Sequence, residues 1–294
     1  MKKNLVFLLC LVSLMSTPVL AFAANVGLRV TGGGAFTFSP AGSNQWSDDM
    51  ISYDTTSSNI PQIGTSNKDW NGTWISGANK ASYAGKGTSD ANADFGKLGV
   101  SSYAQVSGKT EWGDNVPYTY WDWSVGTSAF ASFEDEWLMD LGSLNGTTGT
   151  ISIDVYLDGN RTSNMEHFNT TLGLTFGNHT ANYQKTYGPD ISEGLFTFTA
   201  DFKYGETNNI YMSLISGASS YNQWGDGGES YVNFLNTAQV TGLTFYDATG
   251  NEITGYTLTT GSGHNYAAVP SPSTVWLLGS GLMALAGFGR KSGK

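Results

Sequence analysis

The sequence predicts an all-β fold, and an antiparallel β-sandwich of the jelly-roll type is the first choice. Glycine is abundant, with 38 residues, and proline is scarce, with seven. Few segments repeat apolar residues at the helical period of 3.6, whereas several short segments alternate apolar and polar residues between turn signals. About 245 residues, from Ala24 to Ala268, are available to this fold, which is enough for one substantial sandwich.

Four regions carry the alternation that predicts strands, and each ends at a turn signal rich in Gly, Asn or Asp. In chain order they are Ile151 to Leu157 ending at Asp158-Gly159; Thr171 to Phe176 turning at Gly177-Asn178 toward Tyr183; Gly194 to Phe202 turning at 205–208 and returning as Ile210 to Ile215; and Ala238 to Tyr246 turning at Asp247 to Asn251 and returning as Ile253 to Leu258. No helical segment separates them, which favours antiparallel pairing.

The N-terminal third of the chain is less regular. Asn25 to Ala35 begins a strand, but Ser39 to Lys97 is rich in Gly, Ser, Asn and Asp. We therefore expect long loops there, with one or two edge strands. No clean linker interrupts the chain, so the sequence predicts a single body over residues 24–260 and a short tether over 261–268.

The N-terminus has the pattern of a secretory signal peptide over residues 1–23. Met1-Lys2-Lys3 is a positive region, Leu5 to Leu14 is apolar, and Ala21 and Ala23 are the small residues of a cleavage site after Ala23. The only cysteine, Cys10, lies inside the apolar region. The exported protein would therefore have no disulfide, no thiolate metal site and no cysteine nucleophile.

The C-terminus, residues 269–294, has the pattern of a membrane-directed signal. Val269, Pro270, Ser271 and Pro272 precede an uncharged run over 274–289, which as a helix would span roughly 24 Å, near the lower limit for crossing a bilayer. Three cations in the final segment 290–294 act as a stop-transfer signal and stay cytoplasmic by the positive-inside rule. These cations are Arg290, Lys291 and Lys294.

This combination resembles the PEP-CTERM sorting signal of Gram-negative, biofilm-forming bacteria, in which a Pro-x-Pro motif, a glycine-rich transmembrane helix and a basic end are cleaved by an exosortase. Family members commonly read Val-Pro-Glu-Pro; here Ser271 replaces the glutamate, a variant that resembles a sister signal of the same system. Two upstream segments, Phe196 to Gly205 and Phe234 to Ile253, also resemble secreted proteins with this signal. The resemblance implies no shared catalytic activity.

The resemblance also implies a route and a set of partners. Signal peptidase and an exosortase-like enzyme would process the chain, and the inner membrane would anchor the precursor before release. The expected destination is the cell surface or the extracellular matrix, in contact with exopolysaccharide. The body between the two signals carries nine basic and 24 acidic residues, and this negative charge disfavours nucleic acid and anionic lipid as partners.

Aromatic residues supply the candidate glycan-binding site. Trp70 and Trp74 flank a short polar segment, and a second run follows further along the chain, containing Tyr118, Tyr120, Trp121 and Trp123. Strand alternation would place Tyr118, Tyr120 and Asp122 on one face and the two tryptophans on the other. Exposed rings beside Asn, Asp and Gln suit sugar binding, while burial of the same rings would make them core residues.

Other groups of polar residues indicate a catalytic or metal-binding function less specifically. Glu134-Asp135-Glu136 with Asp140 contains the carboxylates that glycoside hydrolysis needs, but neighbouring carboxylates on a strand point apart, and we assign no catalytic residue. Asp48-Asp49 and the 226–229 segment could offer oxygen ligands to calcium, while Asp247 to Asn251 is better explained as turn chemistry. His167, His179 and His264 have no zinc-binding spacing.

A short motif occurs twice. Asn44-Gln45-Trp46-Ser-Asp48 and Asn222-Gln223-Trp224-Gly-Asp226 share the pattern Asn-Gln-Trp-x-Asp. Two loops at one end of a sandwich could present these groups to a glycan, and chance is the other explanation in a chain so rich in these residues.

The sequence therefore predicts a non-enzymatic, exported β-sandwich with a structural or glycan-binding role in exopolysaccharide or biofilm, with no required metal or cofactor. A secreted carbohydrate-active enzyme is the alternative, and a calcium-stabilised adhesin is a further one. The enzyme would need two carboxylates that converge in a cleft.

Overall fold

The structure is a computed structural model. It describes residues 24–39, 44–45, 51–58, 60–76, 79–111, 120–163, 168–178, 181–188, 191–223 and 227–266. In this part of the chain, no helix is long and apolar enough to span a membrane. The segment 274–289, for which we expect such a helix, lies outside the described residues.

Two antiparallel sheets make up the fold, which is therefore an all-β sandwich. The first sheet has the order β11-β10-β13-β7-β1-β2, with β3 beside β1 and β15 beside β7. Its strands are β1 (Ala24–Ser39), β2 (Asn44–Gln45), β3 (Ile51–Ser58), β7 (Tyr120–Asp140), β10 (Phe168–Asn178), β11 (Ala181–Tyr187), β13 (Thr207–Gln223) and β15 (Thr257–Thr260). We call it sheet A.

The second sheet, sheet B, has the order β12-β8-β14-β6-β5-β4, with β9 also beside β14. Its strands are β4 (Gln62–Ser76), β5 (Asn79–Asp94), β6 (Lys97–Glu111), β8 (Thr148–Leu157), β9 (Asn160–Ser163), β12 (Gly194–Lys203) and β14 (Gly228–Tyr246). A single turn of 3₁₀ helix, Gly142–Leu144, precedes β8.

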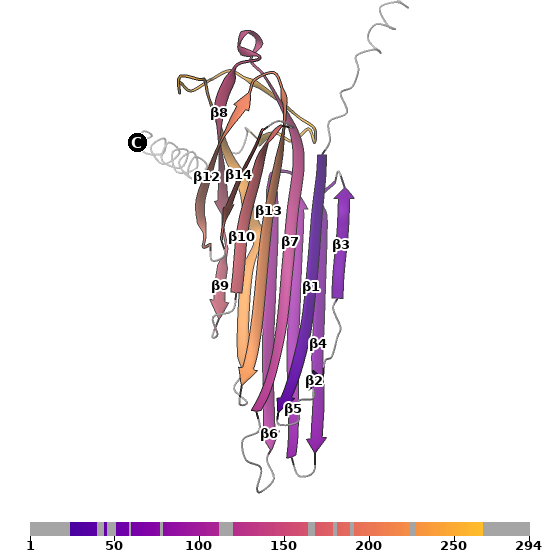
Figure 1. The fold of residues 1–294 in the computed structure, drawn as a ribbon. Helices are drawn as coiled ribbons and strands as arrows, with labels where there is room; N and C mark the ends of the chain where they lie inside the picture. Colours follow the sequence, from indigo (N-terminus) through magenta and orange to yellow (C-terminus); the bar gives the residue numbers. More distant parts are fainter. Residues whose placement is uncertain are drawn as a thin grey trace, which may run out of the picture.

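Long strands give the sandwich an elongated shape (Figure 1). β7 has 21 residues, which corresponds to roughly 70 Å of extended chain. β1, β13 and β7 run side by side over most of that length, and β4, β5 and β6 run behind them in the second sheet (Figure 1).

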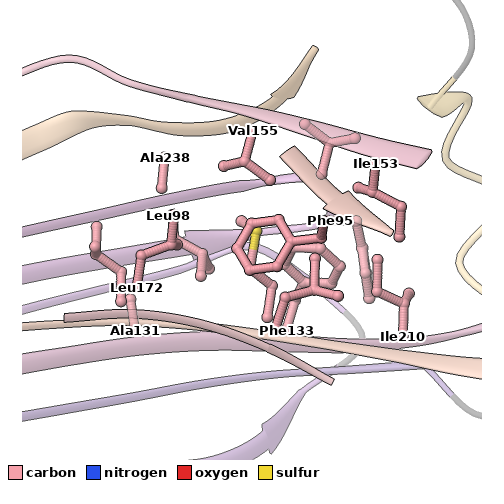
Figure 2. Packing of buried hydrophobic residues seen from close by; sticks show 14 of the residues in the cluster. Phe95, Leu98, Ala131, Phe133, Ile153, Val155, Leu172, Ile210 and Ala238 are labelled. Carbon is pink, nitrogen blue, oxygen red and sulfur yellow. The ribbon is translucent and has the colours of Figure 1, made fainter. Parts of the chain in front are cut away.

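Alternating inward residues of both sheets build one core. In β8, Ile151, Ile153 and Val155 are fully buried, while the residues between them are half-buried. Figure 2 shows how side chains from the two sheets meet. It labels Leu98, Ile153, Val155 and Ala238 of sheet B, Phe95 of the β5–β6 turn, and Ala131, Phe133, Leu172 and Ile210 of sheet A.

The two sheets approach each other closely toward the end of the sandwich where β7 begins. A Cβ on Gly87 of β5 would lie 2.7 Å from Thr127 Cγ2 of β7 and 2.9 Å from Trp70 Cζ3 of β4. A Cβ on Gly85 would lie 2.7 Å from Val125 Cγ2. Glycine at both positions therefore lets β5 approach β7 closely, with the Trp70 ring between them.

This close approach explains why the expectation of long loops over Ser39 to Lys97 is wrong. β3, β4 and β5 occupy most of that stretch, and β5 pairs continuously with β4 on one edge and β6 on the other. Inward positions are filled by small residues such as Gly64, Ser66 and Ser89, which are buried. A composition that is typical of loops is here the composition of closely packed strands, because strand preference depends on the tertiary surroundings.

The predicted strands are present except for the return over Ile253 to Leu258, of which only Thr257 and Leu258 belong to a strand, β15, and this strand pairs with β7. Some of the predicted turns also have a different role. Gly177-Asn178 leads into a hairpin in which Phe176 pairs with Tyr183, as expected. Asp158-Gly159 does not form a hairpin, because β8 and β9 both pair with β14. A Cβ on Gly159 would clash with the backbone of Asn233 and the ring of Phe234, so glycine is needed where the chain passes over β14.

Two further turns carry the chain from sheet B to sheet A. The turn at 204–206 joins β12 to β13, and the segment after Asp247 leads from β14 to β15. Asp247 Oδ1 accepts hydrogen bonds from the backbone N–H of Thr249 at 2.8 Å and of Asn251 at 2.9 Å. The Thr249 hydroxyl and these bonds lower the pKa of Asp247 to about 2. The turn chemistry expected for this segment is confirmed.

Replacing Phe133 with alanine should cost about 3–5 kcal/mol of unfolding free energy, because it removes a fully buried ring from between the sheets. Phe130→Ala is the matched control, since Phe130 lies on the same strand but on the outer, half-buried face, and it should cost about 1 kcal/mol. Urea denaturation of residues 24–268 measures both. Equal losses would contradict the assignment of the inner face.

Candidate functional site

The aromatic run of β7 lies in the middle of sheet A. Trp123 pairs with Phe36 of β1 on one edge and with Asn222 of β13 on the other. Trp121 pairs with Phe38, and Tyr120 with Ser39. Extended β-structure over Tyr120 to Trp123 is therefore confirmed, as the alternation argument requires.

The pairing register brings the repeated motif to this run. Asp122 pairs with Thr37 and with Gln223, and Thr37 pairs in turn with Asn44. On the adjacent rung, Phe36 pairs with Gln45. The sheet therefore contains two neighbouring rungs that include both Asn-Gln pairs of the motif. They are Asn44–Thr37–Asp122–Gln223 and Gln45–Phe36–Trp123–Asn222.

The first of these rungs, which we call the polar rung, belongs to the outer face of sheet A. Ser128 is on the outer face, because its neighbour Ala129 is buried. Asp122 precedes Ser128 by six residues, an even number, so strand alternation places it on the same face. Neighbouring residues on a rung are about 5 Å apart. The polar rung thus aligns the backbones of an asparagine, a threonine, an aspartate and a glutamine along one line of the sheet.

The structure assigns Trp70 to the core. It is 7% exposed, and its ring packs over Gly85 and Gly87 between the sheets. Trp74 pairs with Ala81 in the same hairpin. Tyr118, Trp46 and Trp224 lie outside the described residues. Of the aromatic candidates, Tyr120, Trp121 and Trp123 are the ones that the register brings together with the repeated motif.

The acidic run of β7 does not form a pair of convergent carboxylates. Asp135 points inward and is fully buried, while Glu134 and Glu136 lie on the outer face and are half-buried. Asp140 is exposed and accepts hydrogen bonds at 2.8 Å from the Gly142 N–H and from Asn145 Nδ2. These bonds lower the pKa of Asp140 and give it a role in the turn before β8.

Asp135 holds the end of the described chain against the core. It accepts hydrogen bonds from the Ser262 N–H at 2.9 Å, the Ser262 hydroxyl at 2.5 Å and the Tyr266 hydroxyl at 2.8 Å. The Tyr266 ring is 1% exposed and lies 4.7 Å from the ring of Trp137. Burial, and secondarily Asp135, raise the pKa of Tyr266, so its hydroxyl stays protonated and donates.

The tether expected over 261–268 is therefore wrong for Gly261 to Tyr266, which pack on the body. Sequence reasoning missed this because the segment resembles a polar linker. Asp135 was the residue that could have indicated this packing. A carboxylate at an inward position of an alternating strand needs hydrogen-bonding partners, which another segment of the chain has to supply.

Both ends of the body meet at Asp135. Ala24, the first residue after the expected signal-peptide cleavage, pairs with Asp135 in the β1–β7 ladder, and Tyr266 is bound to the same residue. The polar rung lies 13 residues away along β7, which corresponds to roughly 40 Å. The polar rung and the Asp135 contacts of Ala24 and Tyr266 thus lie toward opposite ends of sheet A (Figure 1).

Metal ligation has limited support in the described part of the chain. No group of three or more His, Cys, Asp or Glu residues is placed there to hold a metal ion. Asp48, Asp49 and Asp226 lie outside it, as do His167 and His179. His264 lies against Tyr266, with ring centroids 4.6 Å apart.

A polar hollow of about 290 Å³ opens where β8 gives way to β9. It is lined by Asp158, Gly159, Asn160, Glu193, Asn233 and Leu235. Asn233 Oδ1 accepts a hydrogen bond from the Leu235 N–H at 3.1 Å, so this amide already contributes to the local fold of β14.

The residues of both terminal signals lie outside the described residues. They are Ala21, Ala23, Val269, Pro270, Ser271, Pro272, Arg290, Lys291 and Lys294. No family model matches the chain, and comparison with curated proteins gives no match either. Export and sorting therefore remain predictions from the sequence.

Tyr266→Phe should lower the unfolding free energy by about 1–3 kcal/mol, because it removes one of three donors from a buried carboxylate. Tyr156→Phe is the control: Tyr156 is 39% exposed on the outer face of sheet B, and its change should stay within about 0.5 kcal/mol. Urea denaturation measures both variants. A Tyr266→Phe value as small as the control would mean that the Asp135 contact does not stabilise the fold.

Proposed function

We propose that this chain is an exported surface or extracellular-matrix protein, sorted by an exosortase-like system, with a non-enzymatic, glycan-binding role in exopolysaccharide. The observation that carries the binding role is the pairing register, which brings Asn44 and Gln223, one from each Asn-Gln pair, onto the rung of Asp122 in β7. These residues come from three distant parts of the sequence and meet on one rung.

The chemistry of these rungs suits a sugar. Hydroxyl groups need partners that donate and accept hydrogen bonds, and amide and carboxylate groups provide both functions. Aromatic rings supply apolar surface for the faces of sugar rings. Asn44, Asp122 and Gln223 provide the former, and Tyr120, which strand alternation puts on the same face of β7 as Asp122, provides the latter.

The position of the polar rung supports a role at a surface. The two ends of the body meet at Asp135, and the expected sorting motif begins three residues after Tyr266. A precursor anchored through the segment 274–289 would then hold the Asp135 end near the membrane and direct the polar rung, roughly 40 Å away, outward.

The jelly-roll assignment is part of this proposal. It is supported by the repeated crossing of the chain between the sheets, from β6 to β7 to β8 and again from β12 to β13 to β14. The flanking signal peptide, over 1–23, and the C-terminal transmembrane helix, over 274–289, complete the proposed organisation.

A non-enzymatic role is preferred over that of a carbohydrate-active enzyme. The acidic run that raised the alternative divides between the two faces of β7, and its central member, Asp135, is occupied by Ser262 and Tyr266. Calcium remains outside the proposal, because the segments that suggested it lie largely outside the described residues.

Expression of the full chain in a host with the matching exosortase should yield a mature protein that starts at Ala24 and ends between Pro270 and Ser273. Intact-mass measurement checks this directly. A mass that retains Thr274 to Lys294 would mean a permanent anchor, and the sorting part of the proposal would be wrong.

Asp122→Ala should weaken glycan binding by about tenfold or more, because it removes a charged hydrogen-bond acceptor from the centre of the polar rung. Asp201→Ala, which removes an exposed carboxylate from β12 of the other sheet, is the control and should bind as the unaltered protein does. A panel of immobilised neutral and acidic oligosaccharides provides the assay. Absence of binding to every glycan, or equal loss in both variants, would contradict the binding role.

A further inference from the structure

A second hollow lies on the outer face of sheet B, where β4, β5 and β6 run side by side. Its volume is about 220 Å³, below the 300–1,000 Å³ of most small-molecule pockets. It is lined by Asp69, Trp70, Asn71, Ala84, Gly85, Lys86, Gln105 and Ser107. A shallow hollow of this size suits one unit of a polymer that lies across the surface.

The register explains why the surface is hollowed there. Asn71, Ala84 and Ser107 form one outward rung, and Asp69, Lys86 and Gln105 form the next. Ala84 is the small residue at the centre of the first rung. The intervening rung carries Trp70, whose ring is buried between the sheets beneath the hollow.

The lining groups are those that bind hydroxyls and a carboxylate. Asn71 and Gln105 provide amides, Ser107 a hydroxyl and Asp69 an acceptor. Lys86 is exposed and provides a compact positive charge. Asp69 faces Lys86 across the β4–β5 pair, and exposed Glu229 of β14 lies beyond Gln105 on the same rung. An incoming carboxylate therefore has to approach Lys86 from the side of Ser107.

The charge distribution of the body singles out this face. Residues 62–111, which form β4 to β6, contain five lysines and four acidic residues. The remainder of residues 24–268 contains four basic and 20 acidic residues. An anionic polymer would be repelled by most of the body, and β4 to β6 form the segment whose own charges nearly balance.

A second lysine extends the pattern. Lys109 is exposed and pairs with Ser82 on the rung beyond Ser107. Lys86 and Lys109 therefore flank the Ala84 rung, and four residues of strand separate their rungs, roughly 13 Å. Two positive charges at this spacing suit a chain that carries carboxylates on several sugars better than a single charged sugar.

We propose that the hollow between Lys86 and Lys109 binds a carboxylate-bearing polysaccharide, with Lys86 as the main carboxylate contact. This rests on the proposed glycan-binding function for the class of ligand, and it adds a second site on the other sheet. The acidic body of a second copy of this chain would also be attracted to the two lysines. It would form fewer hydrogen bonds than a polysaccharide with the amides and the hydroxyl that line the hollow.

The test compares two probes on the mature protein. Calorimetry with hexagalacturonate, whose six sugars carry carboxylates, should detect binding, and maltohexaose, a neutral chain of the same length, should bind at least tenfold more weakly. Raising the ionic strength from about 0.05 to 0.5 M should weaken hexagalacturonate binding further, because the lysines are exposed and therefore screened.

Lys86→Gln should weaken hexagalacturonate binding by about tenfold, because the substitution removes one charge-assisted hydrogen bond to a carboxylate. Lys97→Gln is the matched control. Lys97 is exposed on the outer face of β6, opposite Asp94 and eight residues of strand, roughly 26 Å, from the Lys86 rung. It should leave the affinity within twofold, and thermal melting of both variants checks that the fold is kept.

Three outcomes would overturn the proposal. Equal losses in Lys86→Gln and Lys97→Gln would mean a general charge effect without a site. Loss of hexagalacturonate binding in Asp122→Ala but not in Lys86→Gln would assign the ligand to the polar rung, which would leave the proposed function intact. Self-association detected by sedimentation and abolished by Lys86→Gln would assign this face to a second copy of the chain.

Discussion

Strand β7 organises the molecule because its backbone has to be hydrogen-bonded along both edges over its whole length. β13 pairs with one edge, while β1 and then β15 pair with the other. This arrangement brings the first residue of the body and its last described segment to the same point, Asp135. It also places the aromatic run at the other end of the strand, so that one strand separates the chain ends from the candidate site.

Alternation along β7 then divides its chemistry between two faces. Phe133, Asp135 and Trp137 point inward, where the carboxylate is stabilised by the donors of Ser262 and Tyr266. Most of the described outward residues before Asp140 are half-buried and belong to the outer face of sheet A. Sheet B follows the same rule, since Trp70 fills the interior while Asp69 and Asn71, its neighbours in sequence, line the outer hollow. The two proposed binding surfaces thus lie on opposite sides of one sandwich.

The strands that carry clear alternation were predictable from the sequence, and the Asp247 turn was predictable from its residues alone. The strands β4 and β5 were not, because most of their described inward positions hold glycine, serine or alanine in place of large apolar residues. Those small residues fit only because β5 lies close against β7, a condition that no local pattern reveals. The packing of Gly261 to Tyr266 was missed for a similar reason, since its partner, Asp135, lies more than a hundred residues earlier in the chain.

By itself the sequence determined the all-β class, the absence of cysteine beyond Cys10, the acidic charge and the terminal patterns, because each depends on composition or on residues close together in the chain. Tertiary structure decided which residues meet. The two Asn-Gln pairs are a weak coincidence in the sequence, and they become neighbours of Asp122 only through the registers of β1 with β2 and β7, and of β7 with β13. Register is set by the burial of whole strand faces, a property of the assembled sheets and not of any short segment.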